Sequence, residues 1–426
     1  MPNLYETIEE LQNGGFAERL KKVYLTESEA QQQTERYISL AKDFEEIFGN
    51  RENIRFFSAP GRTEVGGNHT DHNHGRVLAA GINLDAVAIA SKNDENIVRV
   101  KSRGYNMDTV DLSDLSVVDE DMGHSNALVR GMCDGFRKRG YKIGGFDACT
   151  VSSVLSGSGL SSSAAFEVLL GTCLNYLYND GKVDAVTIAQ IAQYAENVHF
   201  GKPCGLMDQM ASSVGGFITI DFADPENPVI EKVDFDFAAC GHALCIVDTK
   251  GNHADLTDEY AAIRAEMESV ASHFGKKVLR DTDEAEFYKN IPAIREKFGD
   301  RAVLRAIHFF CDNARVVSEV EALRKGNFDE FKRLICESGA SSYMYNQNVY
   351  SVKKPAEQPV ALGLAISEQV LKGNGAYRVH GGGFAGTIQA FVPNDMLDTY
   401  KNAVEAVFGE GSCYVLLIRP LGGTEV

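Results

Sequence analysis

The stretch GGNHTDHNHG, from Gly66 to Gly75, contains three histidines and one aspartate within a few positions. Imidazole and carboxylate groups are ordinary metal ligands. They also donate and accept the hydrogen bonds that a hydroxyl-rich ligand needs. The pattern alone therefore leaves three readings open, which are a metal site, a pH-sensitive group and a turn that binds a substrate.

The segment VLSGSGLSSSAAFEV, from Val154 to Val168, combines a glycine-rich turn with the start of a helix. Gly157 and Gly159 allow the backbone to turn tightly and to approach a ligand closely. The serines that follow begin a helix, whose first N–H groups and dipole favour an anion. The segment predicts either a phosphate-binding loop or a helix that is simply capped by serine.

Two carboxylates near residue 200 are also candidates for chemistry. Asp208 lies among small and apolar residues in GKPCGLMDQMASSVGG, where it either caps the next helix or acts as a general base. Glu196, in YAENVHFGK, lies on a predicted helix, where the simplest role is a solvated face. The late run GGGFAG, from Gly381 to Gly386, suggests close backbone packing.

Alternating helical and strand patterns surround these residues. Strong helix formers fill the first 50 residues, and β-like runs begin with IRFFSAPG at Ile54. A strand from Phe146 to Leu155 leads into the glycine-serine loop and then into a helix with apolar residues at a helical period. Further helices precede a β-rich end. The fold class is therefore α+β or α/β.

Composition narrows the range of partners. The chain has 426 residues and a net charge of −18, which argues against a nucleic-acid surface. Nine cysteines without CxxC spacing suggest reduced thiols. The N-terminus has no signal-peptide pattern, and no apolar run has the length of a membrane helix. We expect a cytoplasmic protein with no membrane or nucleic-acid partner.

Taken together, these motifs resemble the galactokinase branch of the GHMP kinases, a superfamily that also includes homoserine, mevalonate and phosphomevalonate kinases. The galactokinase signature runs roughly GRVNLIGEHTDYNxGxVLP, and the matching residues here are Gly61, Arg62, Gly67, His69, Thr70, Asp71, Asn73, Gly75, Val77 and Leu78. The motifs GLSSSAA (Gly159 to Ala165), CGLMDQ (Cys204 to Gln209) and GGGFAG follow in the family's order.

The resemblance implies a role for each matching residue. It implies Asp208 as catalytic base, Arg62 as its partner, and Ser162 and Glu196 as residues that serve Mg²⁺. The implied ATP phosphate loop comprises Gly157, Ser158, Gly159, Leu160, Ser161, Ser162 and Ser163. The implied sugar-binding residues are Asn68, His69, Asp71, Gly205 and Tyr260.

The segment from Gly66 to Gly75, called the sugar turn below, departs from the signature at positions that contact the substrate in the family. The family's glutamate, which contacts the hydroxyl on C6 of galactose, is Asn68 here, and its tyrosine is His72. Upstream, the family's VNLI is TEVG, from Thr63 to Gly66. A neutral amide still hydrogen-bonds a hydroxyl, and it would not repel a carboxylate on C6. A protonated His72 would help to hold such a carboxylate.

The resemblance implies an ATP-dependent sugar 1-kinase that converts galactose to galactose 1-phosphate. The alternatives are a kinase for a C6-modified galactose such as galacturonate and a non-catalytic sugar sensor. We expect an α+β, two-lobed GHMP kinase fold with the active site in the cleft, and a monomer. The expected divisions are a helical extension (1–50), an N-terminal lobe (51–222) and a C-terminal lobe (223–426).

Overall fold

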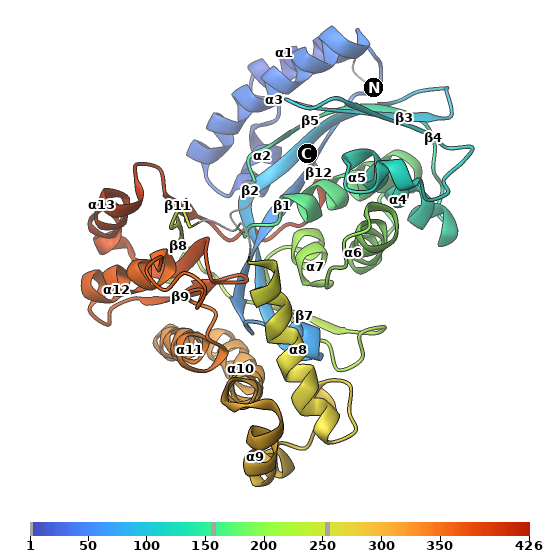
Figure 1. Cartoon of the computed structure of the whole chain (residues 1–426). Helices are drawn as coiled ribbons and strands as arrows, with labels where there is room; N and C mark the ends of the chain where they lie inside the picture. Colours follow the sequence, from blue (N-terminus) through green and yellow to red (C-terminus); the bar gives the residue numbers. More distant parts are fainter. Residues whose placement is uncertain (1–2, 155–158, 252–255) are drawn as a thin grey trace.

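Two β-sheets, each covered by helices, organise the chain into two lobes (Figure 1). The computed structural model describes residues 3–154, 159–251 and 256–426. The mixture of helices and largely antiparallel strands confirms the predicted α+β class.

The larger sheet forms the centre of the N-terminal lobe. Its strand order is β12-β1-β2-β5-β3-β4, and β6 and β7 continue from β2. Its strands are β1 (Arg55–Gly66), β2 (Arg76–Lys92), β3 (Ile97–Ser102), β4 (Met107–Asp111), β5 (Phe146–Ser152), β6 (Phe217–Asp221), β7 (Val229–Val233) and β12 (Thr424–Glu425). Almost every residue of β1 and β2 is buried, because helices cover both faces of the sheet.

Helices α1 (Leu4–Gln12), α2 (Ala17–Tyr24) and α3 (Glu27–Phe48) cover one face and confirm the predicted helical N-terminus. The side chains of Tyr37, Leu40 and Phe44 follow a helical period and are fully buried with sheet residues that include Phe56. The other face carries α4 (Ser125–Lys138), α5 (Ser162–Tyr178), α6 (Ala185–Tyr194) and α7 (Met207–Val214) (Figure 1).

The C-terminal lobe has a four-stranded sheet in the order β11-β8-β10-β9. Its strands are β8 (His242–Asp248), β9 (Ala376–His380), β10 (Thr387–Pro393) and β11 (Cys413–Leu416). The helices of this lobe are α8 (Thr257–His273), α9 (Glu284–Phe298), α10 (Asp300–Arg324), α11 (Phe328–Ser341), α12 (Pro359–Leu371) and α13 (Leu397–Phe408).

The strand pairing moves the expected division between the lobes. We expected the N-terminal lobe to end at residue 222, where prolines interrupt the pattern, yet β7 still pairs with β6 in the larger sheet. The last strand, β12, also returns to this sheet and pairs with β1. The prolines therefore mark a loop between two paired strands, and the chain crosses to the other lobe after Val233.

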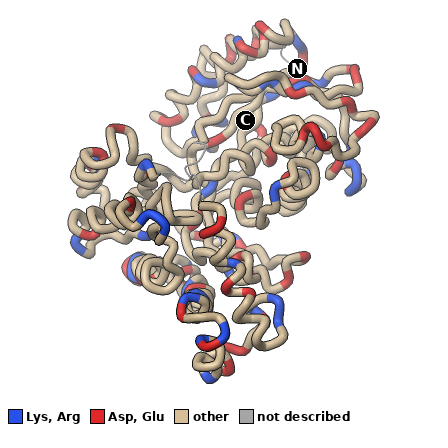
Figure 2. Tube along the Cα trace, in the orientation of Figure 1, with Lys and Arg blue, Asp and Glu red and all other residues tan. Residues whose placement is uncertain are grey.

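Acidic and basic residues are interspersed along the chain in both lobes (Figure 2). Within the described ranges, none of the helices is both long enough and apolar enough to span a membrane.

Candidate active site

Arg62 and Asp208 form a bidentate ion pair between β1 and α7. The distance from Arg62 Nε to Asp208 Oδ1 is 2.7 Å, and that from Nη2 to Oδ2 is 2.8 Å. Two parallel N–H···O bonds hold the carboxylate in one orientation, and the guanidinium charge favours its ionised form. Arg62 also donates to the carbonyl oxygen of Gly159, so that one guanidinium joins the acid to the glycine-serine loop.

Asp208 does not cap a helix. Leu206 occupies the N-cap of α7 without a side-chain capping bond, and Asp208 is the second residue of the helix. Burial of the carboxylate tends to raise its pKa, but the charge and hydrogen bonds of Arg62, together with the Ser161 hydroxyl, hold the pKa of Asp208 below its usual value. The acid is therefore ionised at neutral pH.

The glycine-serine loop reaches the same acid. Ser161 has a left-handed backbone (φ +58°) and precedes the first residue of α5, Ser162. Its hydroxyl donates to Asp208 Oδ2 over 2.7 Å instead of capping α5, so the alternative of a simple serine cap is wrong. Leu160 is buried, and its carbonyl accepts from the Arg62 N–H. Gly157 and Ser158 lie outside the described residues.

Glu196 is buried in a single π-helical turn, η3 (Ala195–Phe200), so the alternative of a solvated helix face is wrong. Its Oε1 accepts from Lys202 Nζ at 2.9 Å, and its Oε2 accepts from Gln209 Nε2 at 2.7 Å. The hydroxyl of Ser163, next to Ser162, lies 3.5 Å from Oε1. The carboxylate thus lies at the start of α5, close to the loop expected to hold phosphate.

The sugar turn lies against the CGLMDQ segment that contains Asp208. A Cβ atom on Gly205 would lie 3.0 Å from Asp71 Oδ2, which places the CGLMDQ segment against this turn. His69 Nε2 is 2.9 Å from the carbonyl oxygen of Gly382, and the Tyr260 hydroxyl donates to that of Gly383 at 2.9 Å. The turn and Tyr260 therefore both contact the GGGFAG loop.

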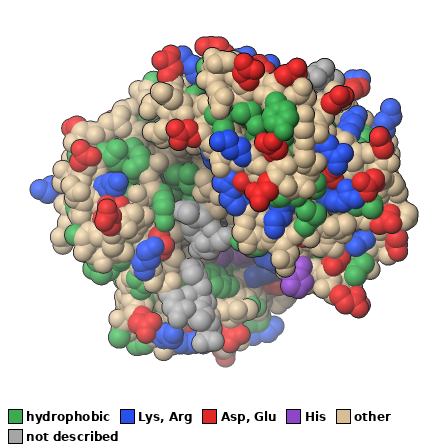
Figure 3. Space-filling model, turned by 90° about the horizontal axis from the view of Figure 1, so that it is seen from above, with side chains coloured by type: hydrophobic (Ala, Val, Ile, Leu, Met, Phe, Trp, Pro, Cys, Tyr) green, Lys and Arg blue, Asp and Glu red, His purple; other side chains and the backbone are tan. Residues whose placement is uncertain are grey.

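The residues that flank the GGGFAG loop lie against the glycine-serine loop. His380, the residue that precedes it, is buried, and a Cβ atom on Gly159 would lie 3.2 Å from His380 Nδ1. The space-filling view from above shows a hollow in which histidine side chains are visible (Figure 3).

The Asn68 amide has no donor or acceptor left for a sugar hydroxyl in this structure. Its side chain is fully buried, and both Nδ2 and Oδ1 have two protein partners each. An amide offers two donors and two acceptor positions, so its hydrogen bonding is complete. This bonding opposes the expectation that Asn68 contacts the substrate.

His72 is not favoured to carry a proton in this structure. Burial is the main cause that lowers the pKa of His72 well below its ordinary value. A protonated His72 that holds a carboxylate is therefore not favoured at neutral pH. Among the residues the structure describes, no group of three or more His, Cys, Asp or Glu side chains is placed to hold a metal ion.

Several functional neighbours were missed by sequence reasoning. Gln209 Nε2 lies between Glu196 and Glu167, 3.1 Å from Glu167 Oε2. Burial, together with the Glu196 charge, raises the pKa of Glu167 well above its usual range, so this carboxyl group is neutral. Arg378 was missed for a different reason, because it comes from a distant strand and contacts Glu64. Of these residues, only Gln209 had a signal in the sequence, because it is a polar residue of the CGLMDQ motif.

Models of two protein families match separate parts of the chain. A model of the galactokinase galactose-binding signature matches residues 42–92, and a model of the GHMP kinase N-terminal domain matches residues 127–216. A galactokinase of Streptomyces coelicolor is 32% identical over 372 residues, which cover 87% of this chain and 92% of that protein.

Two solved structures of known kinases share the fold of this chain. The crystal structure of Lactococcus lactis galactokinase complexed with galactose matches with a TM-score of 0.77 and 26% identity, over 92% of this chain and all of that one. Methanococcus jannaschii mevalonate kinase shares the fold, with a TM-score of 0.62 at 12% identity, over 86% of this chain and 99% of that chain. The chain therefore belongs to the galactokinase family, within the GHMP kinases.

Proposed function

We propose that the protein is a galactose 1-kinase that transfers the γ-phosphoryl group of ATP to the anomeric hydroxyl of galactose. The observation that carries this proposal is the bidentate Arg62–Asp208 pair, which is bonded to the glycine-serine loop and follows Gly205, a residue that lies against Asp71 of the sugar turn. In a family whose members phosphorylate sugars, such an acid lies where a hydroxyl and a phosphate would meet.

Asp208 acts as the general base in this proposal. Its oxygens already accept from Arg62 and Ser161, which hold it ionised and fixed in direction. A carboxylate with a lowered pKa is a weak base, so it accepts the proton as the new O–P bond forms and the hydroxyl becomes acidic. The proton passes to Asp208, the anomeric oxygen bonds to the γ-phosphorus, and ADP leaves. Phosphoryl transfer of this kind depends mainly on positioning and electrostatics.

In this proposal the sugar is held by His69, Asp71, Gly205 and Tyr260. Asp71 lies against Gly205, three residues before Asp208, and His69 and Tyr260 both contact the GGGFAG loop. Burial lowers the pKa of His69 to about 4, so it is a neutral donor and acceptor. The loop from Gly159 to Ser163, with the N-terminus of α5, holds the ATP phosphates.

The residues at Glu196 fit Mg²⁺. A buried carboxylate beside the Ser163 hydroxyl, with Ser162 next to it at the start of α5, is the kind of small oxygen donor set that this ion takes together with phosphate and water. Glu196 and Ser162 would hold the ion, and Lys202 would give up its contact with Oε1. Bound there, Mg²⁺ neutralises charge on the phosphates.

A coupled ADP-release assay with Mg-ATP tests the proposal on galactose, galacturonate, N-acetylgalactosamine and glucose. We expect turnover on galactose. The isosteric variant Asp208→Asn should lower kcat by about 10²–10⁴-fold, as expected for a lost general base, with sugar affinity within about tenfold of wild type. Near wild-type turnover of the variant would mean that another group is the base.

The same assay separates the two alternatives. Turnover on galacturonate alone would make the uncharged residue 68 a specificity switch, although the neutral state of His72 does not favour it. Sugar binding without turnover on any of the four sugars would indicate a sensor. The intact Arg62–Asp208 pair favours the enzyme.

A further inference from the structure

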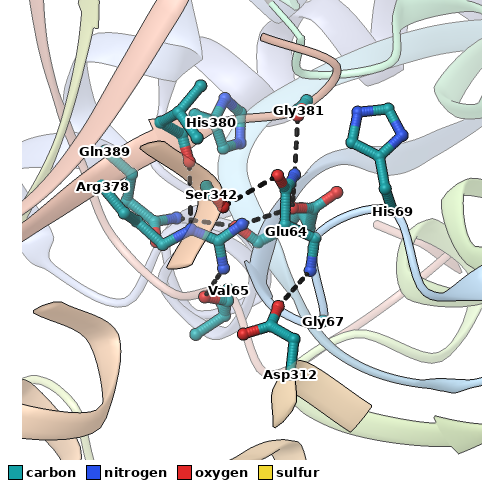
Figure 4. A network of polar contacts seen from close by, with 12 residues as sticks. Glu64, Val65, Gly67, His69, Asp312, Ser342, Arg378, His380, Gly381 and Gln389 are labelled. Atoms are coloured by element: carbon teal, nitrogen blue, oxygen red, sulfur yellow. Dashed lines mark hydrogen bonds and ion pairs between the residues drawn. The ribbon is translucent and has the colours of Figure 1, made fainter. Parts of the chain in front are cut away.

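Asn68 lies where the sugar turn meets the C-terminal lobe. Its Nδ2 donates to Glu64 Oε1 at 2.9 Å and to the carbonyl oxygen of Gly381 at 2.8 Å. Its Oδ1 accepts from Ser342 Oγ at 3.1 Å and from Asn348 Nδ2 at 2.9 Å. Figure 4 shows this network, with Glu64 between Arg378 and the residues of the turn.

The backbone of Asn68 is held by the same lobe. Its N–H donates to Asp312 Oδ2, and its carbonyl oxygen lies within hydrogen-bond distance of His308 Nε2, both at 2.8 Å and both from α10. Of the six bonds to Asn68, only the one to Glu64 stays within the N-terminal lobe. The next residue is His69, which has a left-handed backbone (φ +58°). The residue that presents His69 is thus fixed by five contacts with the other lobe.

Glu64 determines which side chain residue 68 can carry. Its Oε1 also accepts from Arg378 Nη2 at 2.7 Å, and both of these charged side chains are buried. Because Glu64 Oε1 and the Gly381 carbonyl are both acceptors, residue 68 must donate twice. A carboxylate at position 68 would face two acceptors, one of them charged, inside the protein.

The galactokinase signature has asparagine at the position of Glu64 and glutamate at that of Asn68, so the acid and the amide are exchanged in this chain. We propose that Asn68 is a positioning residue, which fixes the sugar turn by joining it to the C-terminal lobe, and that Glu64 is the partner that requires an amide there. The kinetic part of this inference rests on the proposed function.

The isosteric variant Asn68→Asp tests the inference by removing both donors without changing the size of the side chain. We expect the KM for galactose to rise by about 10–100-fold, the loss expected for two bonds of which one goes to a charged group. The KM for ATP and kcat should stay within about threefold of wild type, because the phosphate loop and Asp208 make no contact with the amide.

The double variant Glu64→Gln/Asn68→Asp again places one acid and one amide in contact, but the N–H donor is now on residue 64. We expect Asn68→Asp to lower Tm as well, and we expect the double variant to recover part of this Tm and part of the affinity for galactose. The matched control is Asn175→Asp, because Asn175 is also buried and its amide bonds the N–H and carbonyl of Val183, away from the turn. This control should lower Tm and leave the galactose KM unchanged.

Three results would overturn the inference. The first is an unchanged galactose KM in a folded Asn68→Asp variant, and the second is a double variant with no recovery in either Tm or KM. If Asn68→Asp does not fold, Ser342→Ala removes one bond without adding charge and should raise the galactose KM by about threefold. An unchanged KM there is the third such result. If the wild type has no turnover, the proposed function is wrong. The Tm values of the wild type, of Asn68→Asp and of the double variant would still test whether Glu64 requires an amide at residue 68.

Discussion

At the scale of single residues, the charge state of Asp208 is set by Arg62. Burial alone would raise the pKa of this carboxyl, and the guanidinium at 2.7 and 2.8 Å reverses the direction. A base that stays ionised at neutral pH should not limit the rate there. The acid limb of kcat/KM for the wild type should therefore lie below the ordinary pKa of an aspartate, about 3.9.

The variant Arg62→Met should move this acid limb to higher pH. Without the guanidinium, burial dominates and raises the pKa of Asp208, by about 1–3 units for a lost neighbouring charge. The measurement is the pH dependence of kcat/KM for galactose. The control is Arg280→Met, which removes an arginine whose partners are Asn313 and Asp221, at 3.0 and 2.8 Å, instead of Asp208. An acid limb at the same pH in wild type and Arg62→Met would show that Asp208 is not the titrating base.

The sequence motifs gave the candidate residues of the site, but they did not give most of the contacts of these residues. Arg62, Asp208 and Ser161 lie in recognisable motifs, and the structure brings their side chains together. Asn68 was expected to face a sugar, because its type and position say nothing of Ser342, Asn348 or Gly381, which come from the other lobe. Contacts between residues some 280 positions apart have no local signature in the chain.

At the scale of elements, a buried acid fastens the N-terminal helices to the sheet. Asp85 on β2 is fully buried, and its Oδ1 accepts from Arg36 of α3 at 2.6 Å. Its Oδ2 accepts from the hydroxyl of Tyr24 at 2.7 Å and from Arg419 Nη1 at 3.2 Å. The side chain of Asp85 thus joins the N-terminal helices, strand β2 and the C-terminal Arg419.

Removing this charge should cost stability rather than activity. The variant Asp85→Asn leaves the buried Arg419 and the partly buried Arg36 short of a charged partner, and we expect a loss of about 3–5 kcal/mol in the free energy of unfolding. Denaturant melts at pH 7 measure it. The control Glu27→Gln breaks the exposed pair with Lys21 and should leave the melt unchanged. A loss no larger than that of the control would show that the cluster does not anchor the helices.

The pH dependence of this stability follows from the sign of the shift. Burial opposes ionisation of Asp85, but Arg36 and Arg419 hold its folded-state pKa below the ordinary value. The contribution is therefore complete above the unfolded-state pKa, near 3.9, and is lost as the pH falls through the folded-state value. Wild type should lose more stability than Asp85→Asn on acidification through this window.

At the scale of the whole molecule, the sequence predicted the fold class and the order of elements but placed the division between lobes too early. Helical and alternating apolar patterns are local, and they located the helical N-terminus, α5, the strands β1 and β5, and the β-rich end of the chain. The pairing of β7 with β6 and of β12 with β1 depends on long-range register, which a proline-rich interruption does not reveal. Because strands and contacts cross between the lobes, the sugar turn is held by both of them.

The central claim is that this molecule forms galactose 1-phosphate. Phosphorus NMR of a reaction with galactose and Mg-ATP tests it most directly, because it identifies both the product and the bond formed. The account predicts a sugar phosphate resonance coupled to the anomeric proton, with ADP formed in equal amount, and its loss in Asp208→Asn. ATP hydrolysis to inorganic phosphate alone, or a phosphate coupled to the C6 protons, would contradict the account.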